Sequence, residues 1–153
     1  QTPAICMAAV QQNGDALQFV KDQTPAICMA AVKQYGCALE FVKNQMPEIC
    51  MAAVQQCGYA LQYVIHQTEV ICMAAIQQNW RALEFVKNQT PELCLIALQN
   101  IKELSQSYKY LIKEPTDELK TYLITSDPRM QVLFPDFEVP RPGRLTKAAL
   151  RIN

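Results

Sequence analysis

The chain repeats itself every 22 residues, and this period constrains its fold more than any other feature. Four close copies span residues 1–22, 23–44, 45–66 and 67–88, and the first reads QTPAICMAAVQQNGDALQFVKD. A fifth copy begins at residue 89 as QTPELCLIALQN and then diverges. Tandem copies of this length indicate a repeat architecture, in which each copy buries its apolar face against the next.

Each copy is predicted to form two short helices. Thr2, Thr24 and Thr90 each precede a proline, which is the pattern of an N-cap followed by proline in the first turn. The nearly all-apolar segment that follows is typical of a helix buried between neighbours. A second helix carries apolar residues at positions 16, 17, 19 and 20 of the copy. Between the two helices stands a glycine, which we expect to provide a left-handed or otherwise permissive turn, at Gly14, Gly36 and Gly58.

These elements predict an all-α fold, an α-solenoid of about five 22-residue helix-turn-helix repeats with an irregular Pro-rich C-terminal tail. Helices this short are marginal alone, and identical copies have identical faces, which favours stacking over a closed bundle. We expect four close repeats in 1–88, a degenerate closing repeat in 89–113 and an extra helix in 114–127. Residues 128–153 are predicted as a Pro-rich tail or linker with a short terminal helical turn.

Five of the seven cysteines occupy the same repeat position and are predicted to form a ladder of buried thiols: Cys6, Cys28, Cys50, Cys72 and Cys94. Stacked helices lie about 8–10 Å apart, which is too far for a disulfide or a shared metal ion. Cys37 and Cys57 lie elsewhere in their copies. They either approach each other across adjacent repeats or are two more free thiols. Seven thiols without a disulfide framework predict a reducing compartment.

Two further rows of residues recur with the repeat. The methionine row is predicted to fill the core, and consists of Met7, Met29, Met51 and Met73. The glutamines at Gln11 and Gln12, with their equivalents in later copies, are predicted to form a solvated face together with Gln18, Glu40, Gln62 and Glu84.

The sequence contains no arrangement typical of catalysis, of a cofactor or of a metal site, and we expect the chain not to be an enzyme. There is no nucleophile elbow, no glycine-rich phosphate loop and no metal-ligand spacing. The single histidine, His66, stands where other copies have Asp22, Asn44 and Asn88, which favours a polar residue at a helix end. A Cys–His pair with Cys37 or Cys57 lacks a third member.

The copies differ mainly in one turn, which is the candidate binding surface. The varying positions are thirteen to fifteen of each copy, and the candidate partner-binding residues are Asn13, Asp15, Tyr35, Cys37, Cys57, Tyr59, Asn79, Trp80 and Arg81. Tyrosine, tryptophan and arginine are enriched at interface hot spots. Drift at an exposed turn explains the same variation, so recognition and drift both stay open.

Charge and hydropathy limit the classes of partner. Residues 1–104 hold six basic and eight acidic side chains, a balance of minus two, whereas a nucleic-acid surface needs clustered lysine and arginine. No apolar run approaches the roughly 18 residues that span a bilayer. The basic residues near the end of the chain favour a linker over a patch for an acidic partner, and are Arg141, Arg144, Lys147 and Arg151.

The first copy matches the repeat pattern from its first residue, without a polar capping helix before it. An array that starts this way exposes one apolar face. We therefore expect either further repeats upstream in a larger protein or self-association through the N-terminal repeat.

The pattern T-P-x-I-C-M-A-A-V-x-Q-x-G-x-A-L-x-F-V resembles a short helical repeat family of unknown function, with a core like T-x-E-[IL]-x-x-x-A-V-x-x-[DN]-G-x-A-L-x-[FY]-[VA]. The glutamate of that core is present as Glu48 and Glu92 but is Ala4 and Ala26 in the first two copies, and Trp80 replaces the glycine in the fourth. The resemblance implies an all-helical array within large proteins, including secreted effectors, of bacteria that live inside host cells. It implies a location in the bacterial cytoplasm or the host cytosol, and it names no catalytic residue.

The sequence thus predicts a non-catalytic scaffold for protein–protein interaction, as part of a larger protein. The alternative is a region that regulates or positions an enzyme domain elsewhere in the full chain.

Overall fold

The computed structural model describes residues 2–105, 108 and 111–140, and the described residues form helices and connecting segments without a strand. They divide into two units, Gln1–Ile101 and Lys102–Asn153. The basic tail residues and the predicted terminal helical turn lie beyond residue 140, outside the described part of the chain.

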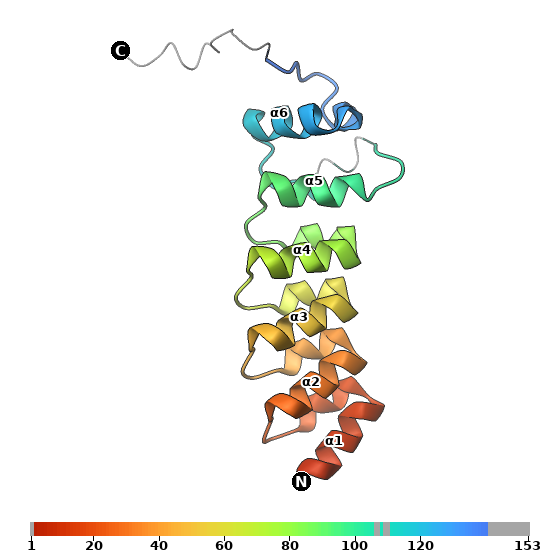
Figure 1. Cartoon of the computed structure of the whole chain (residues 1–153), viewed down its shortest axis with the longest axis vertical. Helices are drawn as coiled ribbons and strands as arrows, with labels where there is room; N and C mark the ends of the chain where they lie inside the picture. The colour runs from red at the N-terminus through yellow and green to blue at the C-terminus, as the bar shows by residue number, and fades with distance from the viewer. Residues whose placement is uncertain (1, 106–107, 109–110, 141–153) are drawn as a thin grey trace, which may run out of the picture. The chain divides into compact units, whose positions relative to one another are not determined.

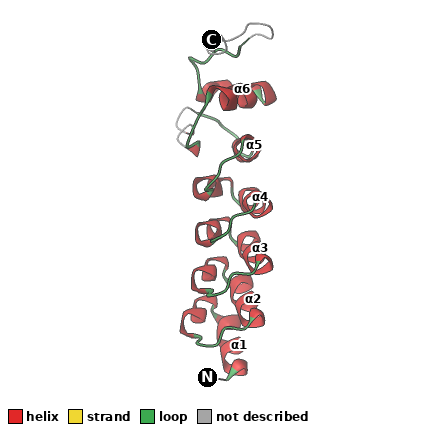
Figure 2. Ribbon diagram, turned by 90° about the vertical axis from the view of Figure 1, so that its left-hand side faces the viewer, coloured by secondary structure: helices red, strands yellow, loops and turns green. Residues whose placement is uncertain are grey.

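The first unit consists of alternating α-helices and short 3-10 helices that pack copy on copy. The α-helices are α1 (Pro3–Gln12), α2 (Pro25–Gln34), α3 (Pro47–Gln56), α4 (Glu69–Gln78) and α5 (Pro91–Gln99). The 3-10 helices are η1 (Gly14–Phe19), η2 (Gly36–Phe41), η3 (Gly58–Tyr63) and η4 (Trp80–Phe85). Within this unit, Figures 1 and 2 show the α-helices stacked in one column and the 3-10 helices in a second column beside it. The predicted solenoid of helical repeats is confirmed.

The helix starts follow the predicted caps. The hydroxyl oxygens of Thr2, Thr24 and Thr90 accept hydrogen bonds from the backbone N–H three residues later, at 3.3–3.4 Å. Proline stands in the first turn of each of these helices. Thr68 caps α4 in the same way, at 3.4 Å. The first, second and fifth copies thus begin with both a threonine cap and a proline, whereas α3 has only the proline and α4 only the cap.

The second helix of each copy is a six-residue 3-10 helix. Its spacing explains this geometry, because residues three apart lie on one face of a 3-10 helix. In the first copy Gly14, Leu17 and Val20 are three apart and all buried. This spacing of three residues fits the 3-10 helices observed. The apolar pairs at positions 16/17 and 19/20 of the copy had instead suggested an α-helix.

The glycines allow close packing, and of the two alternatives predicted for the turn the left-handed one is not adopted. None of the three glycines has a positive φ. A Cβ on Gly36 would lie 2.5 Å from the carbonyl oxygen of Ala53 and 2.9 Å from the Cβ of Cys57, both in the following copy. Gly14 and Gly58 meet their following copies at similar distances. Glycine is thus required because two backbones approach each other here.

The core lies between the two columns and repeats with the sequence. In the second copy Ile27, Ala31 and Val32 from α2 and Leu39 from η2 are at most 2% exposed. The five cysteines of the ladder are buried as predicted. The methionines of the row are only half-buried, so their assignment to the core is wrong.

The glutamine side chain at the first repeat position bonds to backbone groups near the end of its own copy. Gln45 donates from Nε2 to the carbonyl oxygen of Tyr63 at 2.8 Å and accepts from the backbone N–H of Ile65 at 3.0 Å. Gln23 and Gln67 make the equivalent bonds in their copies. These side chains satisfy backbone groups at the end of each 3-10 helix, where the chain crosses to the next copy.

The glutamine at repeat position twelve ties each copy to the one before it. Its Oε1 accepts from a glycine N–H of the preceding copy at 2.6–2.7 Å, from Gln34 to Gly14, Gln56 to Gly36 and Gln78 to Gly58. These glutamines are exposed, as the predicted solvated face requires, and they also join copies, which the sequence did not predict. In the fifth copy this position is Asn100 and the matching glycine is Trp80, so both members of the pair change together.

The second unit contains a further copy of the same local geometry, built from a different sequence. Thr116 caps α6 (Asp117–Ser126), and the 3-10 helix η6 (Pro128–Leu133) follows. The linking residue, Asp127, has φ −146° and ψ 106°, like Asn13 with −147° and 113°. Both side chains accept from the N–H two residues later, at 3.0 Å.

The sequence predicts the extra helix in 114–127 correctly, but it predicts an irregular stretch where η6 lies. Met130 and Leu133 of η6 are buried, as are Leu119, Leu123 and Ile124 of α6. Pro128 fits because it occupies the first turn of the 3-10 helix, where its missing N–H has no partner to lose.

Candidate functional site

The turns between α-helix and 3-10 helix carry all nine predicted candidate residues. Each turn is held by its own backbone, since the N–H of the thirteenth residue donates to the α-helix at 2.8–2.9 Å and its carbonyl oxygen accepts from the 3-10 helix at 2.9–3.0 Å. Asn13 and Asn79 add a side-chain bond to the N–H of Asp15 and Arg81, each at 3.0 Å. The frame of the turn is therefore the same in the first four copies, whatever side chains it displays.

The structure brings candidates from neighbouring copies together. Cys37 in the second copy and Cys57 in the third have their Sγ atoms 3.7 Å apart. Tyr35 lies close to Cys37, and its pKa is raised, first by the charge of the Cys37 thiolate and then by the hydrogen bond between the two side chains. The negative charge of Asp15, in the first copy, also raises the pKa of Tyr35. The fifteenth residue of one copy thus meets the thirteenth residue of the next.

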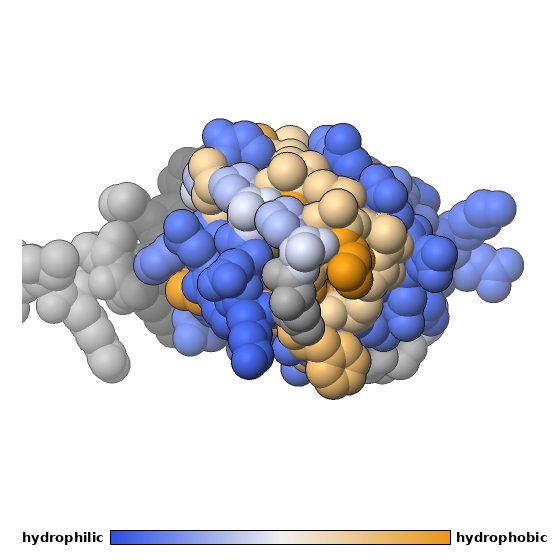
Figure 3. Space-filling view, turned by 90° about the horizontal axis from the view of Figure 1, so that it is seen from below, coloured by the Kyte–Doolittle hydropathy of each residue, from blue (hydrophilic) through white to orange (hydrophobic). Residues whose placement is uncertain are grey.

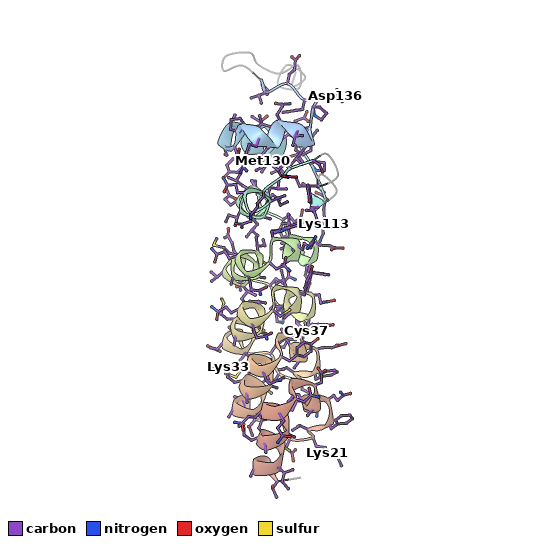
Figure 4. The ribbon with its side chains drawn as sticks, turned by 90° about the vertical axis from the view of Figure 1, so that its right-hand side faces the viewer. Lys21, Lys33, Cys37, Lys113, Met130 and Asp136 are labelled. Carbon is purple, nitrogen blue, oxygen red and sulfur yellow. The ribbon has the colours of Figure 1, made fainter. Side chains whose placement is uncertain are left out.

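The third and fourth copies also meet at their turns. The Cβ of Asn79 lies 3.0 Å from the point where Gly58 would carry its own Cβ. The ring of Tyr59 meets Phe85 edge-on, with centroids 5.9 Å apart. Arg81 lies over the ring of its neighbour Trp80, 4.7 Å from the centroid. We call the nine candidates, which follow one another along four copies, the turn row. Figure 4 shows Cys37 on the side of the 3-10 helices and Lys33 on the side of the α-helices.

Exposure differs along the turn row. Asn13, Tyr35 and Arg81 are exposed, and Tyr35 is 42% exposed. The remaining six are half-buried: Asp15, Cys37, Cys57, Tyr59, Asn79 and Trp80. A partner approaching this edge would meet Tyr35 and Arg81 first.

The α-helix column presents a second surface that the sequence analysis missed. Positions 5, 6, 9 and 10 of the copy face the core, which leaves positions 4, 7, 8 and 11 on the opposite face of the helix. A shallow groove between α1 and α2 is lined by Met7, Gln11, Ala26, Met29, Ala30, Lys33 and Gln34. The signal was available, because 4, 7, 8 and 11 have helical spacing of their own, but the apolar methionines and alanines concealed it.

His66 is exposed and lies in the bend after η3, two residues past the capping Val64. Within the described residues, no three histidine, cysteine or acidic side chains are close enough to share a metal ion. No helix in the part of the chain that the structure describes has the length and apolar character to cross a membrane.

Comparison with known proteins gives one match. A family model described as "Domain of unknown function (DUF4116)" matches residues 5–46, 25–67 and 47–114. The chain belongs to this family. The overlapping DUF4116 matches step along the chain in the manner of its 22-residue copies, and the last reaches past α5 into the second unit. No curated protein and no solved structure matches the chain.

Proposed function

We propose that this DUF4116 array is a non-catalytic scaffold that binds a protein partner through the turn row. The observation that supports this is that structural positions and turn positions of each copy differ in how much they vary. The glycines and the position-twelve glutamines, which join copies, are nearly constant, and so is the position-one glutamine, which bonds to the end of its own copy. The residues that meet along one edge vary. Repeat arrays bind along such a repeated ridge. Drift alone predicts no dependence of binding on these side chains.

A capture experiment tests the proposal. The wild-type chain is immobilised beside a Tyr35→Ala, Arg81→Ala variant and a Lys33→Ala, Gln77→Ala control on the α-helix face, and bound proteins from a cell lysate are quantified by mass spectrometry. These four residues are exposed, so the fold should survive each change. We expect the turn variant to lose the specific partner and the control to keep it, because truncating a hot-spot residue costs about 2 kcal/mol or more of binding free energy.

Equal capture by the turn variant and wild type would remove the turn row from the proposal, and loss only in the control would move the binding surface to the α-helix face. If nothing is captured specifically, the scaffold proposal fails, and a region that positions an enzyme domain becomes the better description.

We also propose self-association through the N-terminal end of the first copy, because its apolar face is uncovered. Ile5 is 64% exposed and Phe19 is 68% exposed. Figure 3 views this end from below and shows apolar side chains gathered next to polar ones. We expect the sedimentation coefficient of wild type to rise with concentration, and that of Phe19→Glu to stay constant. Gln18→Glu is the matched charge control, and equal behaviour of wild type and Phe19→Glu would contradict the proposal.

The reducing compartment and the bacterial-effector context stay predictions from the sequence. The compartment is consistent with seven free cysteines in the structure.

A further inference from the structure

Two cysteines of the chain differ from the other five in their surroundings. Cys37 is the second residue of η2, and Cys57 is the C-cap residue of α3. The two cysteines therefore belong to adjacent copies and are 20 residues apart in the sequence. Their Sγ atoms are 3.7 Å apart and both side chains are half-buried, which leaves them within reach of a small reagent.

The packing of the turns holds this pair together. A Cβ on Gly36, the residue before Cys37, would lie only 2.9 Å from the Cβ of Cys57. The backbone of Gly36 is tied to the third copy by its bond to Gln56 Oε1 at 2.6 Å. The pKa of Cys37 is raised to about 11, first by burial and then by its hydrogen bond to Cys57. The hydrogen bond between the two thiols places the sulfurs face to face across the two copies.

The ladder cysteines follow one another at intervals of one copy. They are buried, and Cys28, Cys50 and Cys72 each direct Sγ to a glutamine Oε1 of their own copy at 3.7 Å. The next ladder thiol is one whole copy away, about 8–10 Å for packed helices. A disulfide needs sulfur atoms about 2 Å apart, so the ladder positions do not suit one.

We propose that Cys37 and Cys57 form a specific, reversible disulfide between the second and third copies when the chain meets a hydroperoxide. One thiolate attacks a peroxide oxygen, the O–O bond breaks, and a sulfenic acid and hydroxide form, the latter leaving as water with the thiol proton. The second thiol then attacks the sulfenic sulfur, the S–S bond forms, the S–O bond breaks and a second water leaves. Two electrons and two protons pass from the thiols to the peroxide, and a small dithiol reductant reverses the change.

The bond would join two copies that are otherwise held by packing and hydrogen bonds alone. A crosslink restricts the unfolded chain and thereby stabilises the folded one, so oxidation should raise the melting temperature. It would also fix the centre of the turn row, between Tyr35 and Tyr59. The assignment itself does not depend on any partner, so it can hold or fail separately from the proposed scaffold.

Peptide mapping of the intact chain tests the proposal. Reduced protein is treated with hydrogen peroxide, free thiols are counted after denaturation, and crosslinked peptides are identified without reduction. We expect free thiols to fall from seven to five, with one crosslink between tryptic peptides 34–43 and 44–81. Because the second peptide also contains Cys50 and Cys72, fragment spectra of the crosslinked pair must place the bond at Cys37 and Cys57. A dithiol peptide in the same tube shows that the oxidant is active.

Variants separate the pair from the other thiols. Cys37→Ser and Cys57→Ser should each abolish the crosslink and the rise in melting temperature, whereas Cys50→Ser, at a ladder position, should keep the crosslink. Circular dichroism of the reduced variants shows whether each folds. Seven thiols remaining in oxidised wild type, or a crosslink that includes a ladder cysteine in place of this pair, would overturn the proposal.

Discussion

The first and second copies share the helical sequence PAICMAAV, yet the two helices are buried to very different extents. Ile5 is 64% exposed, and its equivalent Ile27 is 2% exposed. Phe19 is 68% exposed, whereas Phe41 is half-buried. The difference comes entirely from position in the array, because α2 has a copy on both sides and α1 has one on a single side. The stability of a copy is thus largely a property of its neighbours.

The largest expected effect sharpens this comparison directly. Ile27→Ala should lower the free energy of unfolding by about 2–4 kcal/mol, because it leaves a cavity between two copies. Ile5→Ala makes the same chemical change at an exposed site and should cost less than about 1 kcal/mol. Urea unfolding followed by circular dichroism measures both. Equal losses for the two variants would mean that burial does not depend on position in the array.

The next prediction concerns the contact between turns. Gly36→Ala should lower the free energy of unfolding by about 1–3 kcal/mol, since the new Cβ would meet the Ala53 carbonyl oxygen at 2.5 Å and force the copies apart. Glu84→Ala, an exposed change in η4, is the control and should stay within about 0.5 kcal/mol of wild type. A stabilised Gly36→Ala would show that glycine is not required for close approach here.

A smaller loss is expected at the first-position glutamine, which bonds to backbone groups at the end of its own copy. Gln45→Ala should cost about 1–2 kcal/mol, because the Tyr63 carbonyl and the Ile65 N–H lose their partner. Gln55→Ala removes an exposed glutamine from α3 and should change the unfolding free energy by less than about 0.5 kcal/mol. Similar values for both variants would contradict the structural role of the first repeat position.

The smallest effect is a pH dependence from the buried ladder. Burial raises the pKa of Cys94 to about 11 from an ordinary value near 9. Between pH 9 and pH 11 the unfolded chain binds fewer protons than the folded one. The contribution of Cys94 to the free energy of unfolding is therefore fully present below pH 9 and is lost as the pH rises through 11. At pH 10 the ionisation of Cys94 alone should lower the free energy of unfolding by about 1 kcal/mol.

This contribution is measured as a difference under reducing conditions. The drop in unfolding free energy between pH 8 and pH 10 should be smaller in Cys94→Ala than in wild type by about 1 kcal/mol. The same drop in both proteins would show that burial does not shift this thiol.

Much of the fold could be predicted from local signals. The threonine caps, the prolines and the 22-residue period place the α-helices, and the cysteine ladder follows from the same period. The glycines and the glutamines could not be interpreted in this way. Gly36 is required by a backbone in the next copy, and Gln56 by an N–H in the copy before it. These are contacts between residues about 20 positions apart, which no local propensity encodes.

The turn row was partly predictable, since variation among the copies marks it without any structure. Its internal contacts were not. The sequence left open whether Cys37 and Cys57 approach each other, and the stacking of copies brings their sulfur atoms to 3.7 Å. For the methionine row, the sequence predicted a core position that the structure does not show. An apolar residue was assigned to the core although its helix also has an outward face.

The sequence alone determined that this chain is a helical repeat array, because period, caps and apolar spacing are properties of a single copy. Only the tertiary structure decided which apolar residues are covered, which polar side chains join the copies and which turn residues meet. Those outcomes depend on the neighbour that each copy receives. The same sequence PAICMAAV in α1 and α2 therefore lies in different environments.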